Sequence, residues 1–270
     1  MPIFMDRHNF EGISAAEIAG AHVRDLEVQG EFGVRFLTYW FDEARSTGFC
    51  LVDAPDRETA MRVHAKAHGQ IASDIIEVDI SAVEAFLGRI ADPAAPAPGV
   101  APAVDSAFRA VMFTDIVDST GMTARLGGTR SVEMVRTHDS MVRRALGDGG
   151  GREIKHTGDG IMASFDDVVA AVGSTCAIQR SFDGFNRNSD EKLQVRIGVH
   201  SGEPVEDSND LFGATVQMAA RICAEAAAEA IVVSDVVHRD VSDRFTLKGL
   251  GPHHLKGFAE PVALYEVDWR

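Results

Sequence analysis

The sequence predicts an α+β fold built from two ferredoxin-like α/β sandwich domains joined by a Pro/Ala-rich linker. Residues from 2 to about 80 alternate between strand and helix signals in the order β-α-β-β-α-β, which is the ferredoxin-like order. Residues 88–106 read GRIADPAAPAPGVAPAVDS, a composition typical of a semi-extended linker. After the linker, apolar strands mix again with amphipathic helices. The 270 residues therefore divide into a first domain (1–87), the linker and a second domain (107–270).

Composition and charge exclude several classes of protein. The chain is 45% hydrophobic and 25% charged, as in ordinary soluble domains. It begins without a basic segment followed by an apolar one, and no apolar run reaches the roughly 18 residues of a membrane span. We therefore expect a cytoplasmic protein with no membrane partner. The net charge of −15 opposes binding to phosphate backbones, so we expect no nucleic-acid partner. The three cysteines form no C-x-x-C pair, which fits reduced thiols.

In the first domain, start and stop signals mark two helices. Ser14 and Glu17 form a capping box for a helix that ends near Gly30. A second helix runs from Asp56 to His68 and is closed by the following glycine. Apolar and aromatic residues predict the strands around them. The predicted strands span residues 2–6, 34–41, 48–52 and 75–78.

Four histidines give this domain a possible metal site. His64 and His68 are four residues apart on one helix, a usual spacing for two metal ligands. His22 lies on the helical stripe that faces the sheet, and His8 follows the first strand. The alternative is that these are partly buried, hydrogen-bonded histidines or a solvated pair. A transition-metal site and a purely structural role both stay open at this point.

The segment also resembles a family of small ferredoxin-like bacterial proteins, mostly of unknown function, for which nickel binding has been described. The shared features are MDRH, GVRFLTYWF, FCLV-x-AP and H-x-x-x-H-G. The resemblance implies that His8, His22, His64 and His68 could hold a nickel-like transition metal.

The second domain is predicted from alternating strand and helix signals. Apolar residues recur at helical spacing over 131–146, and further helices are expected over 167–182 and 214–226. The polar stretch FNRNSDEK is expected to be a loop. Strands are predicted at 193–199, 231–234 and 262–267, in addition to the two segments that carry the candidate site.

Two carboxylates stand at the ends of adjacent predicted strands. The apolar run AVMF leads to Asp115, as in a buried strand that ends at the rim of a sheet. Asp159 lies in Thr157-Gly158-Asp159-Gly160, where glycines favour a tight turn between two strands. Carboxylate oxygens suit Mg²⁺ or Mn²⁺, and two of them can hold a metal pair for displacement at phosphorus. The alternative is a helix cap at Asp115 and a plain turn at Asp159.

From about Phe108 to the C-terminus the chain resembles the catalytic core of class III nucleotide cyclases. The resemblance is carried by FTDIVDST, KHTGDG, DLFGATVQMAAR and LKGFAEPVALYEV. It implies two Mg²⁺ or Mn²⁺ ions per active site, held by Asp115, Asp159 and the backbone carbonyl of Ile116. Backbone N–H groups at the following helix start could cradle a triphosphate. The expected substrate-binding segment comprises Phe113, Thr114, Ile116, Val117, Asp118, Ser119 and Thr120.

Two further residues are expected to read the base. In the resembled family the position of Lys155 contacts the purine and belongs to the subunit opposite the metal-binding aspartates, and Asp210 matches the second purine-reading position. A lysine donates to adenine N1 and a carboxylate accepts from its amine, whereas guanine mismatches both. The pair predicts ATP over GTP. The alternatives are a surface ion pair for Lys155 and a helix N-terminal residue for Asp210.

One helix and one loop supply the remaining catalytic candidates. Gln217 and Arg221 are four residues apart and face the same way. The family has asparagine and arginine at these positions, orienting the ribose and stabilising the transferring phosphoryl group. Gln217 departs by one methylene, and a misplacement of that size can lower a rate by orders of magnitude. Lys256 is expected at the β- and γ-phosphates, with an exposed surface lysine as the alternative.

These observations predict an adenylate cyclase that converts ATP to 3′,5′-cyclic AMP and pyrophosphate. A head-to-tail homodimer would let each chain offer its metal half to one site and its base half to the other. The first domain would then act as a sensor or dimerisation module. Two alternatives stay open: a non-catalytic nucleotide-binding regulatory protein, favoured by Gln217, and a cyclase with another base preference.

Overall fold

The computed structural model describes residues 1–93, 105–205 and 210–270, and these form two compact units. Met1–Phe108 and Glu203–Gly213 make up the first unit, and Arg109–Gly202 and Ala214–Arg270 make up the second. Each unit has its own sheet, which confirms the predicted mixed α/β class. Residues 94–104, the centre of the predicted linker, lie outside the described residues, so the predicted domain boundaries stay predictions.

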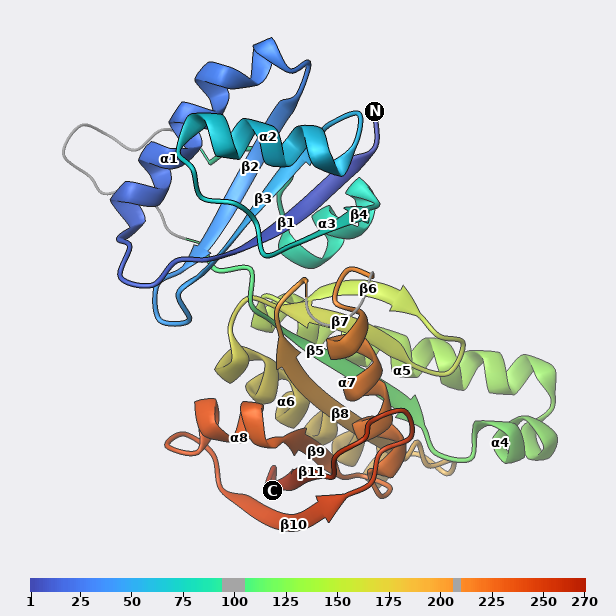
Figure 1. The fold of residues 1–270 in the computed structure, drawn as a ribbon. Coiled ribbons are helices and arrows are strands. Elements are labelled where there is room, and N and C mark those ends of the chain that lie inside the picture. Colours follow the sequence, from blue (N-terminus) through green and yellow to red (C-terminus); the bar gives the residue numbers. More distant parts are fainter. Residues whose placement is uncertain (94–104, 206–209) are drawn as a thin grey trace. The chain divides into compact units, whose positions relative to one another are not determined.

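The first unit has a four-stranded antiparallel sheet in the order β2-β3-β1-β4, as in a ferredoxin-like fold. The helices α1 and α2 lie side by side on one face of this sheet (Figure 1). Its elements are β1 (Ile3–Asn9), α1 (Ala15–Val28), the 3₁₀ turn η1 (Gln29–Glu31), β2 (Arg35–Asp42), β3 (Thr47–Asp53), α2 (Arg57–Ala67), β4 (Asp74–Val78) and α3 (Ile80–Leu87).

Side-chain caps explain where these helices begin and end. The predicted capping box of Ser14 and Glu17 is present with both of its hydrogen bonds. Asp56 caps α2 through the N–H of Thr59. The helix α3 was not predicted, although Asp79 caps its start and Gly88 ends it in the left-handed conformation at φ 77°. A helix of eight residues is short for recognition by periodicity alone.

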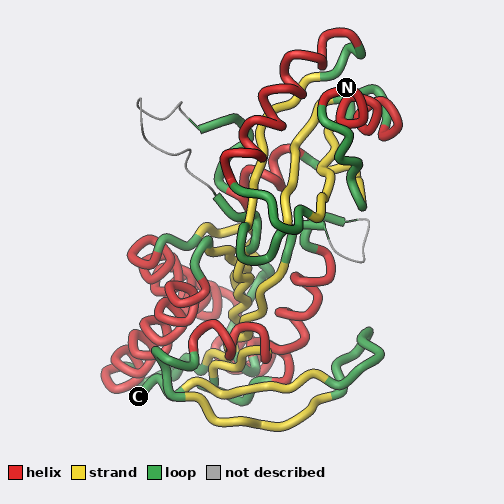
Figure 2. The backbone as a smooth tube through the Cα atoms, turned by 60° about the vertical axis from the view of Figure 1, so that its left-hand side comes forward, coloured by secondary structure: helices red, strands yellow, loops and turns green. Residues whose placement is uncertain are grey.

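The second unit has a seven-stranded sheet in the order β10-β11-β9-β8-β5-β7-β6. Figure 2 colours the strands of the structure yellow and its helices red. Its strands β8-β5-β7-β6 repeat the ferredoxin-like order, and β8 and β9 form a parallel pair. The elements are β5 (Arg109–Ile116), α4 (Ser119–Leu126), α5 (Gly128–Gly149), β6 (Arg152–His156), β7 (Ile161–Phe165), α6 (Val168–Asn188), β8 (Val195–Gly202), α7 (Gly213–Glu225), β9 (Ile231–Ser234), α8 (Asp235–Val241), β10 (Leu247–His253) and β11 (Val262–Val267).

The two faces of this sheet differ in what covers them. Val195, Ile197 and Val199 of β8 join the core formed with α5 and α6. Successive side chains of a strand point to opposite faces, so Arg196 points away from that core, and it donates to the carbonyl of Ala224 at the end of α7. The face opposite α5 and α6 therefore remains available for polar side chains beside α7.

Three features of this unit differ from the sequence predictions. The helix α6 continues to Asn188, so the prediction of a loop over FNRNSDEK is wrong for its first four residues, where Phe185 packs against the core. The helix α8 and the strand β10 were not predicted. β10 reads LKGLGPH, whose glycines and proline are unusual in a strand, and it is the edge strand beside β11.

Candidate functional site

The strand β5 places Thr114 and Asp115 on opposite faces of the second sheet. Thr114 faces α5, where its hydroxyl lies 3.2 Å from the ring of His138. Asp115 lies on the face of Arg196, whose Nε and Nη2 donate to its Oδ2 at 2.7 and 2.6 Å. In this structure a guanidinium therefore neutralises the first candidate metal ligand. A metal ion bound at Asp115 would take the place of the Arg196 guanidinium as the group that neutralises this carboxylate.

The turn between β6 and β7 places Asp159 against the end of β5. The N–H of Ile116 donates to the backbone carbonyl of Asp159 at 3.1 Å, and the hydroxyl of Ser119 donates to its carboxylate at 2.5 Å. Gly158 has φ 98°, as the turn prediction requires. Gly160 is needed for another reason, because a Cβ there would lie 1.9 Å from the carbonyl oxygen of Thr114. Main-chain contacts thus join the two segments that carry the carboxylates.

The predicted phosphate-binding segment leads into α4. The N–H groups of Ile116 and Val117 donate to the carbonyls of Asp159 and Gln194, so they do not serve a phosphate in this structure. Asp118 has φ 54° and caps α4 by accepting from the N–H of Gly121 at 3.2 Å. A surface pocket follows at this point, and its lining includes Ser119, Thr120 and Asp159. Phe113 lies two residues before Asp115, on the same face of β5.

A β-bulge in β6 sets the direction of Lys155. Glu153 pairs with Ala163 and Lys155 with Met162, which leaves Ile154 as the extra residue. The bulge brings Glu153 and His156 to the same face, where both contact α5 through Arg143 and Asp139. The exposed Lys155 consequently points to the opposite face, the face of Asp115.

The other predicted nucleotide contacts lie at exposed positions. Gln217 and Arg221 are exposed on α7, and Lys256 is exposed in the turn between β10 and β11. Asp210 belongs to the first compact unit, so its pairing with Lys155 stays a prediction.

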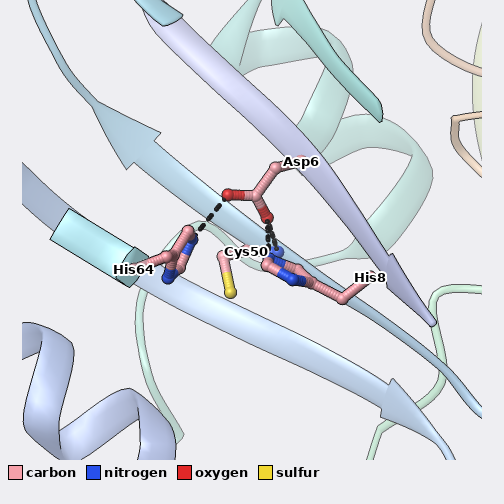
Figure 3. A group of neighbouring side chains, drawn as sticks. All are labelled: Asp6, His8, Cys50 and His64. Carbon is pink, nitrogen blue, oxygen red and sulfur yellow. Dashed lines mark hydrogen bonds and ion pairs between the residues drawn. The ribbon is translucent and has the colours of Figure 1, made fainter. Parts of the chain in front are cut away.

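The first unit gathers two of its histidines around a buried carboxylate (Figure 3). Asp6 is fully buried, with its Oδ2 2.8 Å from Nε2 of His64 and its Oδ1 3.2 Å from Nε2 of His8. The backbone N–H of Cys50 also donates to Asp6, at 2.9 Å. One donor atom from each of Asp6, His8, Cys50 and His64 lies within 4.8 Å of the others.

His64 is shared with a second group. Its Nδ1 lies 3.1 Å from Oδ1 of Asp25 and 3.1 Å from Nε2 of His68, which lies 3.2 Å from the other oxygen of Asp25. A pocket in the first unit is lined by His22 together with His8, His64 and His68. His22 nevertheless stands outside both ligand groups, with its Nε2 3.0 Å from Asp92. The structure thus brings three of the four predicted histidines into two groups of possible ligands.

Burial and charge set the protonation of these groups in opposite directions. Burial alone would lower the pKa of His64, but the carboxylates of Asp6 and Asp25 raise it well above its usual range. Burial would raise the pKa of Asp6, yet the histidines beside it bring that pKa below its usual range. Burial raises the pKa of the Cys50 thiol to about 12. The apo group therefore holds protons that a bound metal would displace.

Two family models match parts of the chain. Residues 105–268 match the family model of the adenylate and guanylate cyclase catalytic domain. The chain belongs to this cyclase family. Residues 4–78 match a second model, described as nickel responsive protein SCO4226-like.

Curated and solved cyclases cover the second part of the chain. A Rhizobium meliloti (strain 1021) protein named "Putative adenylate cyclase 3" is 34% identical over 119 residues, which are 43% of this chain and 20% of that protein. The adenylate/guanylate cyclase/hydrolase structure from Silicibacter pomeroyi is 28% identical, with a TM-score of 0.51, and covers 59% of this chain and 95% of its own. The adenylyl cyclase CyaB from P. aeruginosa has a TM-score of 0.54 at 21% identity, covers 60% of this chain and 93% of its own, and supports the fold alone.

The chain spans only part of the length of its curated relatives. It matches between 6% and 20% of the length of the first three of them. In residues 1–93, 105–205 and 210–270, none of the helices combines the length and apolar character that a membrane crossing requires.

Sequence reasoning missed several residues of both candidate sites. In the second unit, called the cyclase unit from here on, Arg196 stands directly opposite Asp115 in the β5–β8 register. No sequence pattern reveals this pairing. In the first unit, Asp6 and His8 are two residues apart on one strand and therefore share a face. That alternation could have been recognised. The addition of Cys50 depends on its pairing with Asp6 across β1 and β3, which only the fold supplies.

Proposed function

We propose that this cyclase converts ATP to 3′,5′-cyclic AMP and pyrophosphate at the interface of a head-to-tail homodimer. The observation that carries the proposal is the main-chain junction of β5 with the β6–β7 turn, which anchors Asp115 and Asp159 on neighbouring segments. Oxygen ligands on adjacent elements fit Mg²⁺ or Mn²⁺. The relatives named adenylate cyclases support ATP as the substrate. The pair of Lys155 and Asp210 supports it as well.

The residues divide between holding metal and binding nucleotide. Asp115, Asp159 and the carbonyl of Ile116 would hold two divalent ions. When bound, such ions lower the pKa of the attacking ribose 3′-hydroxyl and neutralise the pyrophosphate that leaves the α-phosphorus. Arg221 would stabilise charge on the transferring phosphoryl group, and Lys256 would contact the outer phosphates. Water or a substrate phosphate would take the hydroxyl proton.

Exposure favours the dimer. The side chains of Lys155, Gln217, Arg221 and Lys256 are exposed, and in the described part of the chain none has a side-chain hydrogen bond or ion pair. Unpaired polar side chains on a sheet face and on a helix can meet a nucleotide that a second copy presents. Each copy would then complete the site of the other.

Product analysis tests the proposal. Purified protein is incubated with Mn²⁺ and, separately, ATP, GTP, CTP or UTP, with Asp115→Asn as the control. We expect cyclic AMP from ATP alone and a loss of at least about 100-fold in the control, since metal and oriented charge supply several kcal/mol. A cyclic product from another nucleotide would overturn the base assignment.

The absence of any product, despite a dimer and measurable ATP binding, would favour a non-catalytic nucleotide-binding protein. Gln217 is the feature that supports this second function. Gln217→Asn would then be the next variant, because the shorter amide restores the family's residue. Recovered turnover would show that side-chain length alone limited the rate.

We further propose that the first unit binds a divalent transition metal through Asp6, His8, Cys50 and His64. The supporting observation is His8, which is 1% exposed. Among the described residues its Nδ1 has no hydrogen bond, and its Nε2 has only the 3.2 Å contact with Asp6. Imidazole, thiolate and carboxylate together suit nickel, zinc or cobalt. Cobalt titration should give a sulfur-to-metal absorption band that Cys50→Ser removes. An unchanged band would exclude Cys50 as a ligand.

This unit would then sense metal for the cyclase. Metal-dependent changes in dimerisation or turnover, lost in His64→Gln, would support this role. Identical behaviour of the two proteins would refute it.

A further inference from the structure

A continuous chain of hydrogen bonds runs behind the turn that carries Asp159. It joins backbone N–H groups on either side of that residue, those of Gly158 and Ile161. Gly158 donates to Nδ1 of His156 at 3.2 Å, and Nε2 of His156 lies 2.9 Å from Oδ2 of Asp139. The other end passes through His138 and Thr114. The remaining contacts are Asp139 Oδ1 with His138 Nδ1 at 3.0 Å, His138 Nε2 with Thr114 Oγ1 at 3.2 Å, and the N–H of Ile161 donating to Thr114 Oγ1 at 3.0 Å.

Donor and acceptor chemistry assigns every proton in this chain. A backbone N–H can only donate, so Nδ1 of His156 accepts and its Nε2 carries the proton, which it donates to Asp139. The second carboxylate oxygen likewise accepts from Nδ1–H of His138. Nε2 of His138 then accepts the hydroxyl proton of Thr114. The two histidines therefore hold opposite tautomers around one carboxylate.

Burial supports this assignment. His138 is fully buried, Thr114 is 2% exposed and Asp139 is 8% exposed, whereas the side chain of His156 is 35% exposed. Burial lowers the pKa of His138 despite the neighbouring carboxylate, which keeps its ring neutral. The single charge of Asp139 faces Arg143, whose Nη1 lies 3.7 Å away. A buried polar network with every member satisfied fixes one geometry, whereas a partly satisfied network does not.

We propose that His138, Asp139 and His156 are positioning residues that hold the Asp159 turn in register with Asp115. This rests on the proposed two-metal cyclase. The chain passes through Thr114, next to Asp115 on β5, and its two ends lie on either side of Asp159. Because the protons of both arms point toward Asp139, a shift of the turn leaves a donor or an acceptor unpaired. At the buried Thr114 and His138 this costs about 1–3 kcal/mol.

Asp139→Asn tests the proton assignment without reference to catalysis. An amide offers one acceptor and one donor face, so only one histidine can keep its tautomer. We expect His138 to reverse, because the Thr114 hydroxyl can accept a second hydrogen bond. His156 should not reverse, since its Nδ1 proton would then point at the N–H of Gly158. Imidazole ¹⁵N shifts of the wild type and the variant report both tautomers, and any other pattern would refute the assignment.

Substitutions of His156 test the positioning role. His156→Ala removes the acceptor of the Gly158 N–H and should weaken Mn²⁺ binding to the nucleotide-free protein about 10- to 100-fold, the range typical of residues that orient metal ligands. His156→Asn should restore most of that affinity, because an asparagine side chain accepts from the N–H two residues on. Electron paramagnetic resonance of free Mn²⁺ measures both, with EDTA-washed protein.

The control is Asp183→Asn, which removes a carboxylate from an exposed ion pair with Arg187 on α6. It should bind Mn²⁺ as the wild type does. Equal binding by wild type and His156→Ala would overturn the proposal, as would loss of binding in His156→Asn equal to that in the alanine variant. These readouts need no turnover, so a wild type that makes no cyclic nucleotide would refute the proposed function while leaving this test intact.

Discussion

The two units each hold a cluster of histidines and carboxylates, and the clusters differ in how completely their atoms are paired. In the cyclase unit every nitrogen of His138 and His156 has one partner and one possible proton position. In the first unit, Nδ1 of His64 approaches both a carboxylate and the ring nitrogen of His68, while among the described residues Nδ1 of His8 lacks a hydrogen bond. Paired nitrogens indicate a scaffold, and surplus lone pairs around a buried thiol indicate a ligand site.

Charge separates the clusters in the same way. His64 lies between two carboxylates that raise its pKa. His138 has one carboxylate, that of Asp139, at 3.0 Å from its ring, and burial lowers its pKa. The first cluster thus holds protons that a metal can displace, whereas the second keeps the ring of His138 neutral.

The largest expected effect is the loss of metal binding when the shared histidine is removed. His64→Gln deletes a nitrogen common to both ligand groups of the first unit. The affinity for Co²⁺ should fall by at least about 100-fold, because the loss of a ligand exceeds the 10- to 100-fold effect of an orienting residue. Calorimetric titration of the metal-free protein measures the change.

His138→Gln is the matched control, a buried histidine replaced by the same amide in the other cluster. Its titration with Co²⁺ should keep the wild-type affinity at the site of the first unit, whatever happens to metal binding at Asp115 and Asp159. If both variants lost the metal equally, the distinction between a ligand group and a scaffold would fail.

The second expected effect is an opposite response of the two units to pH. The folded-state pKa of His64 lies above its usual 6.5, so its contribution is complete below pH 6.5 and is lost as pH rises. His200, with its Nδ1 2.7 Å from the Ser234 hydroxyl, has a pKa lowered to about 4 by burial. Its contribution is complete above pH 6.5 and falls by about 3 kcal/mol as pH drops toward 4.

Hydrogen exchange of the slowest amides in each unit, corrected for intrinsic rates, measures these trends in the metal-free protein. The first unit should lose protection between pH 6.5 and 8.5, by on the order of 2–3 kcal/mol. The cyclase unit should lose protection toward acid, and His200→Gln should flatten that slope. Parallel trends in the two units would contradict the charge comparison.

Most of the fold follows from local signals in the sequence. The capping box at Ser14 and the alternation in β8 depend only on neighbouring residues, so these elements were predicted. Elements with weak local patterns were missed, as β10 illustrates, because its pairing with β11 overrides its glycines and proline. The end of α6 was misplaced because Phe185 gains its helical position from packing.

The residues of the candidate sites also divide into those predicted from local signals and those that only the fold brings together. Asp115 and Asp159 stand in motifs that can be recognised from neighbouring residues alone. In the structure a backbone hydrogen bond joins their segments. Arg196 and Cys50 become partners of the sites only through strand register, and the direction of Lys155 depends on the bulge at Ile154. The hydrogen-bond chain around the Asp159 turn could not be predicted for a further reason. His138 occupies a core position on an amphipathic helix, where its spacing is the same as that of an apolar residue.

The smallest expected effect comes from Arg143, an exposed residue beside that hydrogen-bond chain. Arg143 makes a two-pronged ion pair with Glu153, at 2.7 and 2.9 Å, and is 49% exposed. Exposed pairs of this kind contribute roughly 0–1 kcal/mol. Arg143→Gln should therefore lower the free energy of unfolding by less than about 1 kcal/mol, as measured by urea denaturation, and leave Mn²⁺ binding unchanged. A loss of Mn²⁺ affinity as large as in His156→Ala would mean that the charge of Arg143, rather than the hydrogen-bond chain, holds the turn.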